Sequence, residues 1–118
     1  MAKPELEFHT PPAEWLRPDG AAPGIWEQEL SRDPSTGDST VLQRYDPGTH
    51  SSPGVITHRF WEEVILLEGD LHDVTANLTF TAGMYACRPP GMPHGPYLST
   101  TGCVMYVTTR HTQPGPST

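Results

Sequence analysis

The residues with the clearest chemical potential in this sequence are two histidines and one glutamate. His58 and Glu62 lie four positions apart in a segment dense in Val, Ile, Phe, Trp and Leu, a composition typical of a β-strand. Because side chains alternate between the faces of a strand, both should point to the same side as Ile56, Val64 and Leu66. That face should lie in the interior, where an unpaired imidazole or carboxylate is costly. A divalent cation would compensate for the cost.

The second histidine, His94, closes a stretch rich in proline and glycine, residues 83–94. Such a stretch predicts a rigid turn that returns His94 over the mouth of the fold, with little conformational entropy left to lose when a metal binds. We therefore expect His58, Glu62 and His94 to hold one divalent metal ion. Two imidazoles and one carboxylate form an open-faced set that suits iron(II) with oxygen, or a hydrolytic zinc.

The spacing around His94 resembles the second motif of the cupin superfamily. That motif reads Gly, five residues, Pro, one residue, Gly, two residues and His, then three residues and Asn. Gly83, Pro89, Gly91 and His94 meet the first four requirements, and Leu98 replaces the closing Asn.

The segment around His58 resembles the first cupin motif, a His-x-His pair followed by Glu and Gly. His58, Glu62 and Gly69 occupy their positions, and Ile56 stands where the first His should be. Cupins of this kind usually bind iron, manganese, zinc, nickel or copper through three His and one Glu. The resemblance thus implies a site with one ligand missing, which His50, His72 or water could replace, and iron or zinc is the expected metal.

The resemblance covers residues 40–109 and implies an all-β fold, a single cupin jelly-roll β-barrel. Within the superfamily, residues 61–69, 88–91 and 102–103 are most similar to the ChrR-like subgroup, named for the zinc-binding cupin half of a bacterial anti-sigma factor. That subgroup also resembles small diketone-cleaving dioxygenases. The expected function is that of a metal-dependent enzyme, with dioxygenase-type cleavage of a small oxygenated molecule favoured. A zinc-binding sensor or regulatory module, an isomerase or cyclase, and a metal-free barrel are the alternatives.

Three residues are expected to take part in catalysis. Glu62 could act as a base if it leaves the metal. Arg88 could hold a carboxylate or oxyanion of the substrate, although an ion pair with a nearby acid is an equal alternative. Tyr106 is expected to line the pocket as a proton donor, a role for which Tyr85 and Tyr97 also qualify.

Composition excludes several other functions. The 118 residues carry 14 acidic and 7 basic side chains, for a formal charge of −7, and no basic cluster is present to bind nucleic acid. Prolines and charges in the first thirty residues leave no room for a signal peptide or a membrane span, so a soluble, cytoplasmic protein is expected. Cys87 and Cys103 are expected to be reduced thiols, although a hairpin centred near residue 95 would make them a redox pair.

Three regions are expected: an irregular N-terminal arm over residues 1–23, the barrel over 24–109 and a disordered tail over 110–118. Turn signals and strand-forming residues predict strands at 25–30, 39–45, 55–67, 71–74, 78–80, 83–88 and 102–109. A loop is expected over 46–54 and a tight turn at Glu68-Gly69-Asp70. The open edge strands of a small barrel need covering, so a homodimer is expected, with the arm reaching across to its partner.

Overall fold

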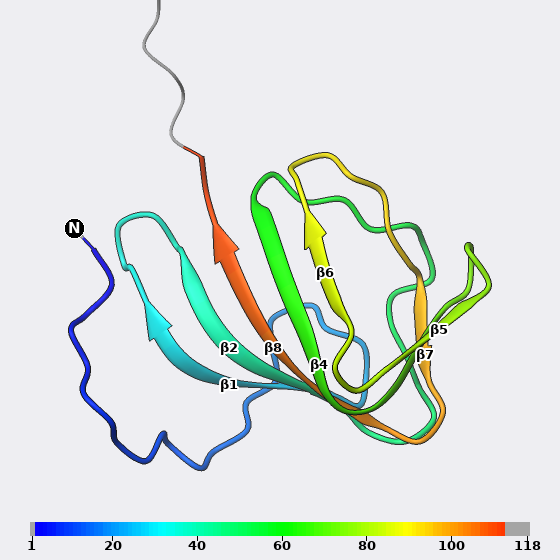
Figure 1. The fold of residues 1–118 in the computed structure, drawn as a ribbon, viewed down its shortest axis with the longest axis horizontal. Helices are drawn as coiled ribbons and strands as arrows, with labels where there is room; N and C mark the ends of the chain where they lie inside the picture. The colour runs from blue at the N-terminus through cyan, green and yellow to red at the C-terminus, as the bar shows by residue number, and fades with distance from the viewer. Residues whose placement is uncertain (1, 113–118) are drawn as a thin grey trace, which may run out of the picture.

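The computed structural model describes residues 2–112, which form β-strands and no helix (Figure 1). The all-β prediction is therefore confirmed. Nothing in this part of the chain forms a helix long and apolar enough to cross a membrane. The strands are β1 (Ile25–Arg32), β2 (Ser39–Tyr45), β3 (Thr49–His50), β4 (Trp61–Asp73), β5 (Leu78–Thr81), β6 (Tyr85–Arg88), β7 (Tyr97–Ser99) and β8 (Cys103–Arg110).

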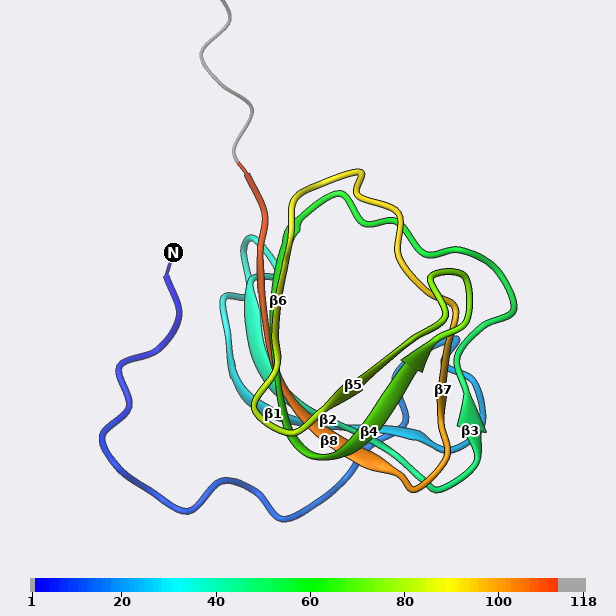
Figure 2. The ribbon, with the colours of Figure 1, turned by 45° about the vertical axis from the view of Figure 1, so that its right-hand side comes forward.

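The strands form one strongly curled antiparallel sheet. Its order is β1-β2-β8-β4-β7-β3, and β5 and β6 also pair with β4. Strands β1, β2, β8 and the first part of β4 make one wall, with β6 at its edge, while β3, β5 and β7 make the opposite wall (Figure 2). The inner face between these walls is where the candidate site lies.

Strand β4 passes through both walls, and here the prediction is wrong in two respects. The expected strand at residues 55–67 begins only at Trp61, and the expected turn at 68–70 is instead a bend within a continuous strand. Gly69 makes the bend possible, because it adopts φ 82° and lies opposite Cys103 of β8, a conformation that other residues rarely adopt. Residues up to Gly69 pair with β8, and those from Asp70 onward pair with β5.

Two short strands were not predicted. Residues of β3 were expected to lie in a loop, and those of β7 were assigned to no strand, yet the two strands pair with each other and β7 pairs with the end of β4. Strands of two and three residues are too short to show an alternating pattern in the sequence. They close the wall opposite β8.

The buried core combines aliphatic, aromatic and sulfur-containing side chains from both walls. Its members are Ile25, Val41, Tyr45, Val64, Leu66, Leu71, Tyr97, Cys103, Met105 and Val107. In β8 the buried residues are alternate ones, as expected for a strand with one face inward.

The N-terminal arm is irregular and lies beside the chain's own β1 (Figure 1). Leu16 and Glu27 exchange two backbone hydrogen bonds of 2.8 Å, an isolated bridge on the edge of β1. At the other end of the chain, Arg110 ends β8, and the His111 N–H donates to Asp38 Oδ1 at 2.6 Å. The rest of the tail expected to be disordered, from residue 113 onward, lies outside the described residues.

Candidate metal centre

His58 lies in the loop before β4 and not on a strand, yet its side chain points inward as predicted. Ile56, His58 and Phe60 are partly buried while the residues between them are exposed, so the alternation continues upstream of β4. The His58 ring stacks on Phe60 with centroids 4.6 Å apart. The loop is held to the turn before His94, because the Gly91 N–H donates to the His58 carbonyl at 2.8 Å.

His94 is held by a backbone bridge to Ile56. Ile56 N–H donates to the His94 carbonyl at 2.7 Å, and His94 N–H donates to the Ile56 carbonyl at 2.9 Å. The backbone of residue 56, the position of the missing cupin histidine, thus fixes the backbone of His94, and these bonds do not depend on the isoleucine side chain. The His94 and His58 rings lie 5.0 Å apart, centroid to centroid.

One ring nitrogen of His94 has a partner and the other has none. Nδ1 lies 2.8 Å from the Tyr97 hydroxyl, while Nε2 is buried without a hydrogen-bond partner among the described residues. Burial, together with the nearby Arg88 charge, lowers the pKa of His94 to about 4. The imidazole is therefore neutral near pH 7, with a nitrogen available as a ligand.

Glu62, the second residue of β4, lies between Arg88 and His58. Its Oε1 accepts a hydrogen bond of 2.6 Å from Arg88 Nη1, and its Oε2 lies 3.6 Å from His58 Nε2. The Arg88 and Glu62 side chains are only 11% and 13% exposed. Arg88 therefore already compensates for the buried charge of Glu62. A cation, which the sequence suggested for this purpose, is not required for it.

The three predicted ligands converge. The candidate ligand atoms of His58, Glu62 and His94 all lie within 4.8 Å of one another. Two donors that share an ion at about 2.1 Å lie roughly 3 to 3.5 Å apart, so the His58–Glu62 distance of 3.6 Å is already close to that of a chelating pair. The unpartnered His94 Nε2 fits the same interpretation, since a buried polar atom without a partner is costly. The residues present therefore fit a divalent metal ion.

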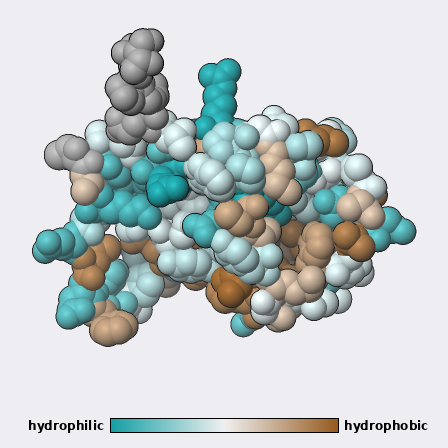
Figure 3. Space-filling model, turned by 45° about the horizontal axis from the view of Figure 1, so that its top comes forward, coloured by the Kyte–Doolittle hydropathy of each residue, from teal (hydrophilic) through white to brown (hydrophobic). Residues whose placement is uncertain are grey.

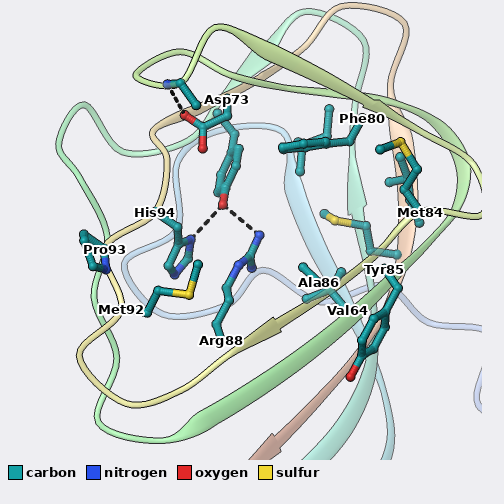
Figure 4. Close-up of a pocket in the computed structure, with 15 residues that line it drawn as sticks. Val64, Asp73, Phe80, Met84, Tyr85, Ala86, Arg88, Met92, Pro93 and His94 are labelled. Atoms are coloured by element: carbon teal, nitrogen blue, oxygen red, sulfur yellow. Dashed lines mark hydrogen bonds between the residues drawn. The ribbon is translucent and has the colours of Figure 1, made fainter.

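Tyr97 connects His94 to Arg88, a contact that the sequence did not reveal. Its hydroxyl accepts a hydrogen bond of 2.7 Å from Arg88 Nη2 and lies 2.8 Å from His94 Nδ1, and the dashed lines in Figure 4 meet there. Burial raises the pKa of Tyr97 to about 12, so the hydroxyl stays neutral. Residues 95–101 showed no strand pattern, and nothing in the sequence placed this side chain inward.

Gln43 is a residue of the site that sequence reasoning missed. It lines a polar cavity of about 130 Å³ together with His58, Glu62 and His94. Gln43 Nε2 donates to Glu27 Oε2 at 3.5 Å. Because Gln43 lies two residues from both Val41 and Tyr45 in a correctly predicted strand, the alternation of β2 would have placed it inward.

The two histidines considered as replacement ligands lie elsewhere. His50 is exposed in β3, opposite Leu98. His72 is in the far part of β4, where its Nδ1 lies 2.9 Å from Thr79 Oγ1. The residues that line the polar cavity include neither.

Tyr106, expected to be a catalytic proton donor, is not brought to the cluster. It is 40% exposed on the outer face of β8, between the buried Met105 and Val107, and lines a shallow depression with Glu63 and Tyr85. The residue is placed outward because β8 alternates, and its inward positions are taken by apolar side chains.

The two cysteines do not form a pair. Cys87 is exposed and Cys103 is buried, and both are free thiols. Cys87 lies opposite Glu63 and Cys103 opposite Gly69 along β4, which separates them by about 20 Å of strand. The hairpin centred near residue 95 does not exist, because β6 pairs with β4 and not with β8.

The curled antiparallel sheet encloses Glu62 of β4 and, from the loops beside it, His58 and His94, an arrangement that agrees with a cupin. Residues 4–113 match the ChrR cupin-like domain family, and the chain belongs to that family. No curated protein sequence matches the chain significantly.

Solved structures confirm the fold. An RmlC-like cupin from Shewanella frigidimarina superposes with a TM-score of 0.70 at 23% identity, covering 96% of each chain. An acetylacetone dioxygenase from Acinetobacter johnsonii gives 0.72 at 20% identity, covering 90% of this chain and 74% of that one. A chain of the Rhodobacter sphaeroides complex of SigE with the anti-sigma ChrR gives 0.62 at 21% identity, and the match covers 82% of this chain but only 49% of that one. At these identities the likeness shows the fold alone.

Proposed function

We propose that this protein is a metal-dependent enzyme that binds one divalent ion through His58, Glu62 and His94. Iron(II) with dioxygen is the favoured combination, zinc the next, and the substrate is a small oxygenated organic molecule. The observation that carries the proposal is the buried, unpartnered Nε2 of His94, which lies in one group with the ligand atoms of Glu62 and His58.

The surrounding residues give each ligand a defined state. Arg88 holds Glu62 Oε1 and leaves Oε2 toward His58. A neutral His94 offers Nε2, and the Tyr97 hydroxyl fixes the orientation of its ring through Nδ1. When bound, the ion would supply Lewis acidity and, in the case of iron(II), the capacity to activate dioxygen. The likeness in fold to an acetylacetone dioxygenase supports this choice of reaction.

Arg88 has a second role in the proposal. It has five N–H donors, and its two described hydrogen bonds go to Glu62 and Tyr97. The remaining donors would bind a substrate carbonyl or enolate oxygen, whose negative charge the guanidinium stabilises. Glu62 is the residue placed to accept a proton from the substrate if its carboxylate leaves the ion.

Metal analysis tests the proposal first. Protein purified without added metal, then exposed to ferrous or zinc salts, should retain about one ion per chain. His94→Gln should weaken binding by at least about tenfold, whereas His50→Gln, an exposed histidine outside the cavity, should leave it unchanged. Oxygen consumption by the iron-loaded protein with a panel of diketones and hydroxyketones then tests the reaction. Absence of any bound ion after exposure to both salts would refute the proposal.

Membership of the ChrR cupin-like family favours one other function, a zinc-binding regulatory module. Such a module would retain zinc with the same ligands but consume no oxygen with any member of the panel. Metal binding without turnover would therefore favour this second function over the first.

A further inference from the structure

A larger, apolar cavity adjoins the polar cavity that contains the candidate ligands. Its volume is about 350 Å³. Its lining includes Leu66, Leu71, Phe80, Met84, Met92 and Met105. Arg88, His94 and Tyr97 are the polar residues that line both cavities, and with the apolar Val64, Leu71 and Met105 they form the boundary between them. Arg88 and His94 are labelled in Figure 4.

The polar groups of the larger cavity lie mainly at this boundary, and most are already engaged. Arg88 donates hydrogen bonds to Glu62 and Tyr97, and the Tyr97 hydroxyl also contacts His94. Asp73, the remaining charged residue of the lining, accepts hydrogen bonds from Ala76 N–H at 3.0 Å and Gly95 N–H at 3.4 Å. Away from the boundary the only other polar side chain in the described lining is Tyr85, whose hydroxyl donates to Glu63, and the remaining walls are hydrocarbon, ring and thioether. A polyol placed there would bury hydroxyl groups without partners, which is unfavourable.

The mouth of the cavity is apolar as well. Met84 and Met92 are 47% and 41% exposed. In the space-filling view, hydrophobic side chains gather on the half of the molecule that carries β5, β6 and β7 (Figure 3). An apolar entrance and an apolar interior favour a ligand that sheds water readily.

We propose that the substrates are carbonyl compounds with an apolar substituent, an alkyl chain or a phenyl ring, and not sugars. The oxygens lie at the boundary beside Arg88 and the candidate ion, and the substituent fills the apolar cavity. This inference rests on the proposed function for the reaction, but the binding preference follows from the cavity itself. A five-carbon diketone would leave most of 350 Å³ empty, whereas cavities of this size accommodate larger ligands. Each added methylene that is buried should tighten binding roughly threefold to fourfold.

Calorimetric titration of the full chain, both metal-free and loaded with redox-inactive zinc, tests this preference. The probes are 2,4-pentanedione, 2,4-heptanedione, 2,4-nonanedione and 1-phenyl-1,3-butanedione, with galacturonate as the sugar control. Affinity should rise with chain length in both forms of the protein, and galacturonate should not bind. Equal affinity along the diketone series, or tighter binding of galacturonate, would overturn the inference.

Variants of the cavity wall assign the effect to this site. Ala86→Phe fills the cavity from β6 and should abolish the advantage of the longer diketones. Ala76→Phe fills it from an exposed turn, where a larger side chain is tolerated, and serves if the first variant fails to fold. The control is Ala82→Phe, an exposed alanine absent from the lining, which should keep the wild-type preference. Loss of preference in the control as well would also contradict the inference.

The two proposals fail in different ways. Binding of long-chain diketones without oxygen consumption by the iron-loaded protein would refute the dioxygenase and leave the cavity preference intact. Turnover with a Michaelis constant that does not change along the diketone series would refute the preference and leave the dioxygenase intact.

Discussion

Tyr97 orients two side chains of the candidate site, those of His94 and Arg88. Its hydroxyl contacts both His94 Nδ1 and Arg88 Nη2. Because Arg88 only donates, the Tyr97 oxygen accepts from it in every state. When Nε2 binds a metal, Nδ1 carries the proton and donates to the same oxygen. The hydroxyl can also donate to an unprotonated Nδ1, so it fixes the orientation of the ring and accommodates the tautomer that the metal needs.

Tyr97→Phe should lower metal affinity by about tenfold to one hundredfold, the usual effect of removing such a partner. Competition titration with a chromophoric chelator measures it. Tyr106→Phe removes a hydroxyl from the outer face of β8 and is the matched control, with no change expected. Equal affinities of the two variants would contradict this assignment.

Glu27 gives a prediction on the pH dependence of stability. Burial raises its pKa above the usual 4.5, an effect that the hydrogen bond from Gln43 partly offsets. As pH rises through the interval above 4.5, the unfolded chain loses this proton before the folded chain does. The folded state therefore holds more protons, and its stability falls as pH rises.

Glu27→Gln removes the buried negative charge, and with it the loss of stability at high pH. The variant should be more stable than the wild type at pH 7, where the glutamate is charged, and should lose the advantage near pH 4, where it is protonated in both states. Urea unfolding at the two pH values measures the difference. Glu68→Gln, at an exposed position of β4, is the control, and an advantage that is equal at both pH values would contradict the explanation.

At the residue scale, the sequence motif was sufficient to identify all three candidate ligands, which the fold brings together. Tyr106 lies outside the motif, and it points outward because Met105 and Val107 on either side of it take the inward positions of β8. Tyr97 was one of three tyrosines considered for the pocket, and the sequence did not single it out because it lies on a strand of three residues, too short for a pattern.

At the scale of elements, β4 depends on Gly69. A Cβ at this position would lie 1.9 Å from the Gly102 carbonyl oxygen, and φ is 82°. Asp70 reinforces the same junction, since its N–H donates to that carbonyl at 3.2 Å and its Oδ1 accepts the Thr101 N–H at 3.0 Å. The sequence predicted a turn here because Glu-Gly-Asp is a turn signal. These long-range contacts instead keep the bent strand paired.

Three alanine substitutions separate strain from collision. Gly69→Ala should destabilise the fold by about 3 kcal/mol or more, because it combines a left-handed backbone with a backbone clash. At Gly83, φ is 93° and a Cβ would meet open space. Gly83→Ala should therefore lower the stability of the fold by only about 1 to 2 kcal/mol. At Gly54, φ is not positive and a Cβ would also meet open space. Gly54→Ala should lower the stability of the fold by less than about 0.5 kcal/mol. Equal losses for Gly69→Ala and Gly83→Ala in chemical denaturation would contradict this ranking.

At the scale of the whole molecule, the position of the N-terminal arm affects whether the chain needs a partner to cover its sheet edge. It was expected to cover the sheet edge of a partner, but part of it lies on the edge of its own β1 through Leu16. That edge is thus partly protected within one chain. The homodimer stays a prediction, for which sedimentation equilibrium of the full chain is the measurement.

The candidate ion would join two segments that are distant in the sequence. His58 lies in the loop before β4 and His94 after the turn that follows β6, and short backbone bridges connect them. An ion that binds only the folded chain adds its binding free energy to folding. Zinc at one hundred times its dissociation constant should therefore stabilise the wild type by about 2.7 kcal/mol. Denaturant unfolding with zinc or with a chelator measures this, and His94→Gln should lose most of the gain while His72→Gln keeps it. If zinc stabilises both variants equally, its binding site is elsewhere on the chain.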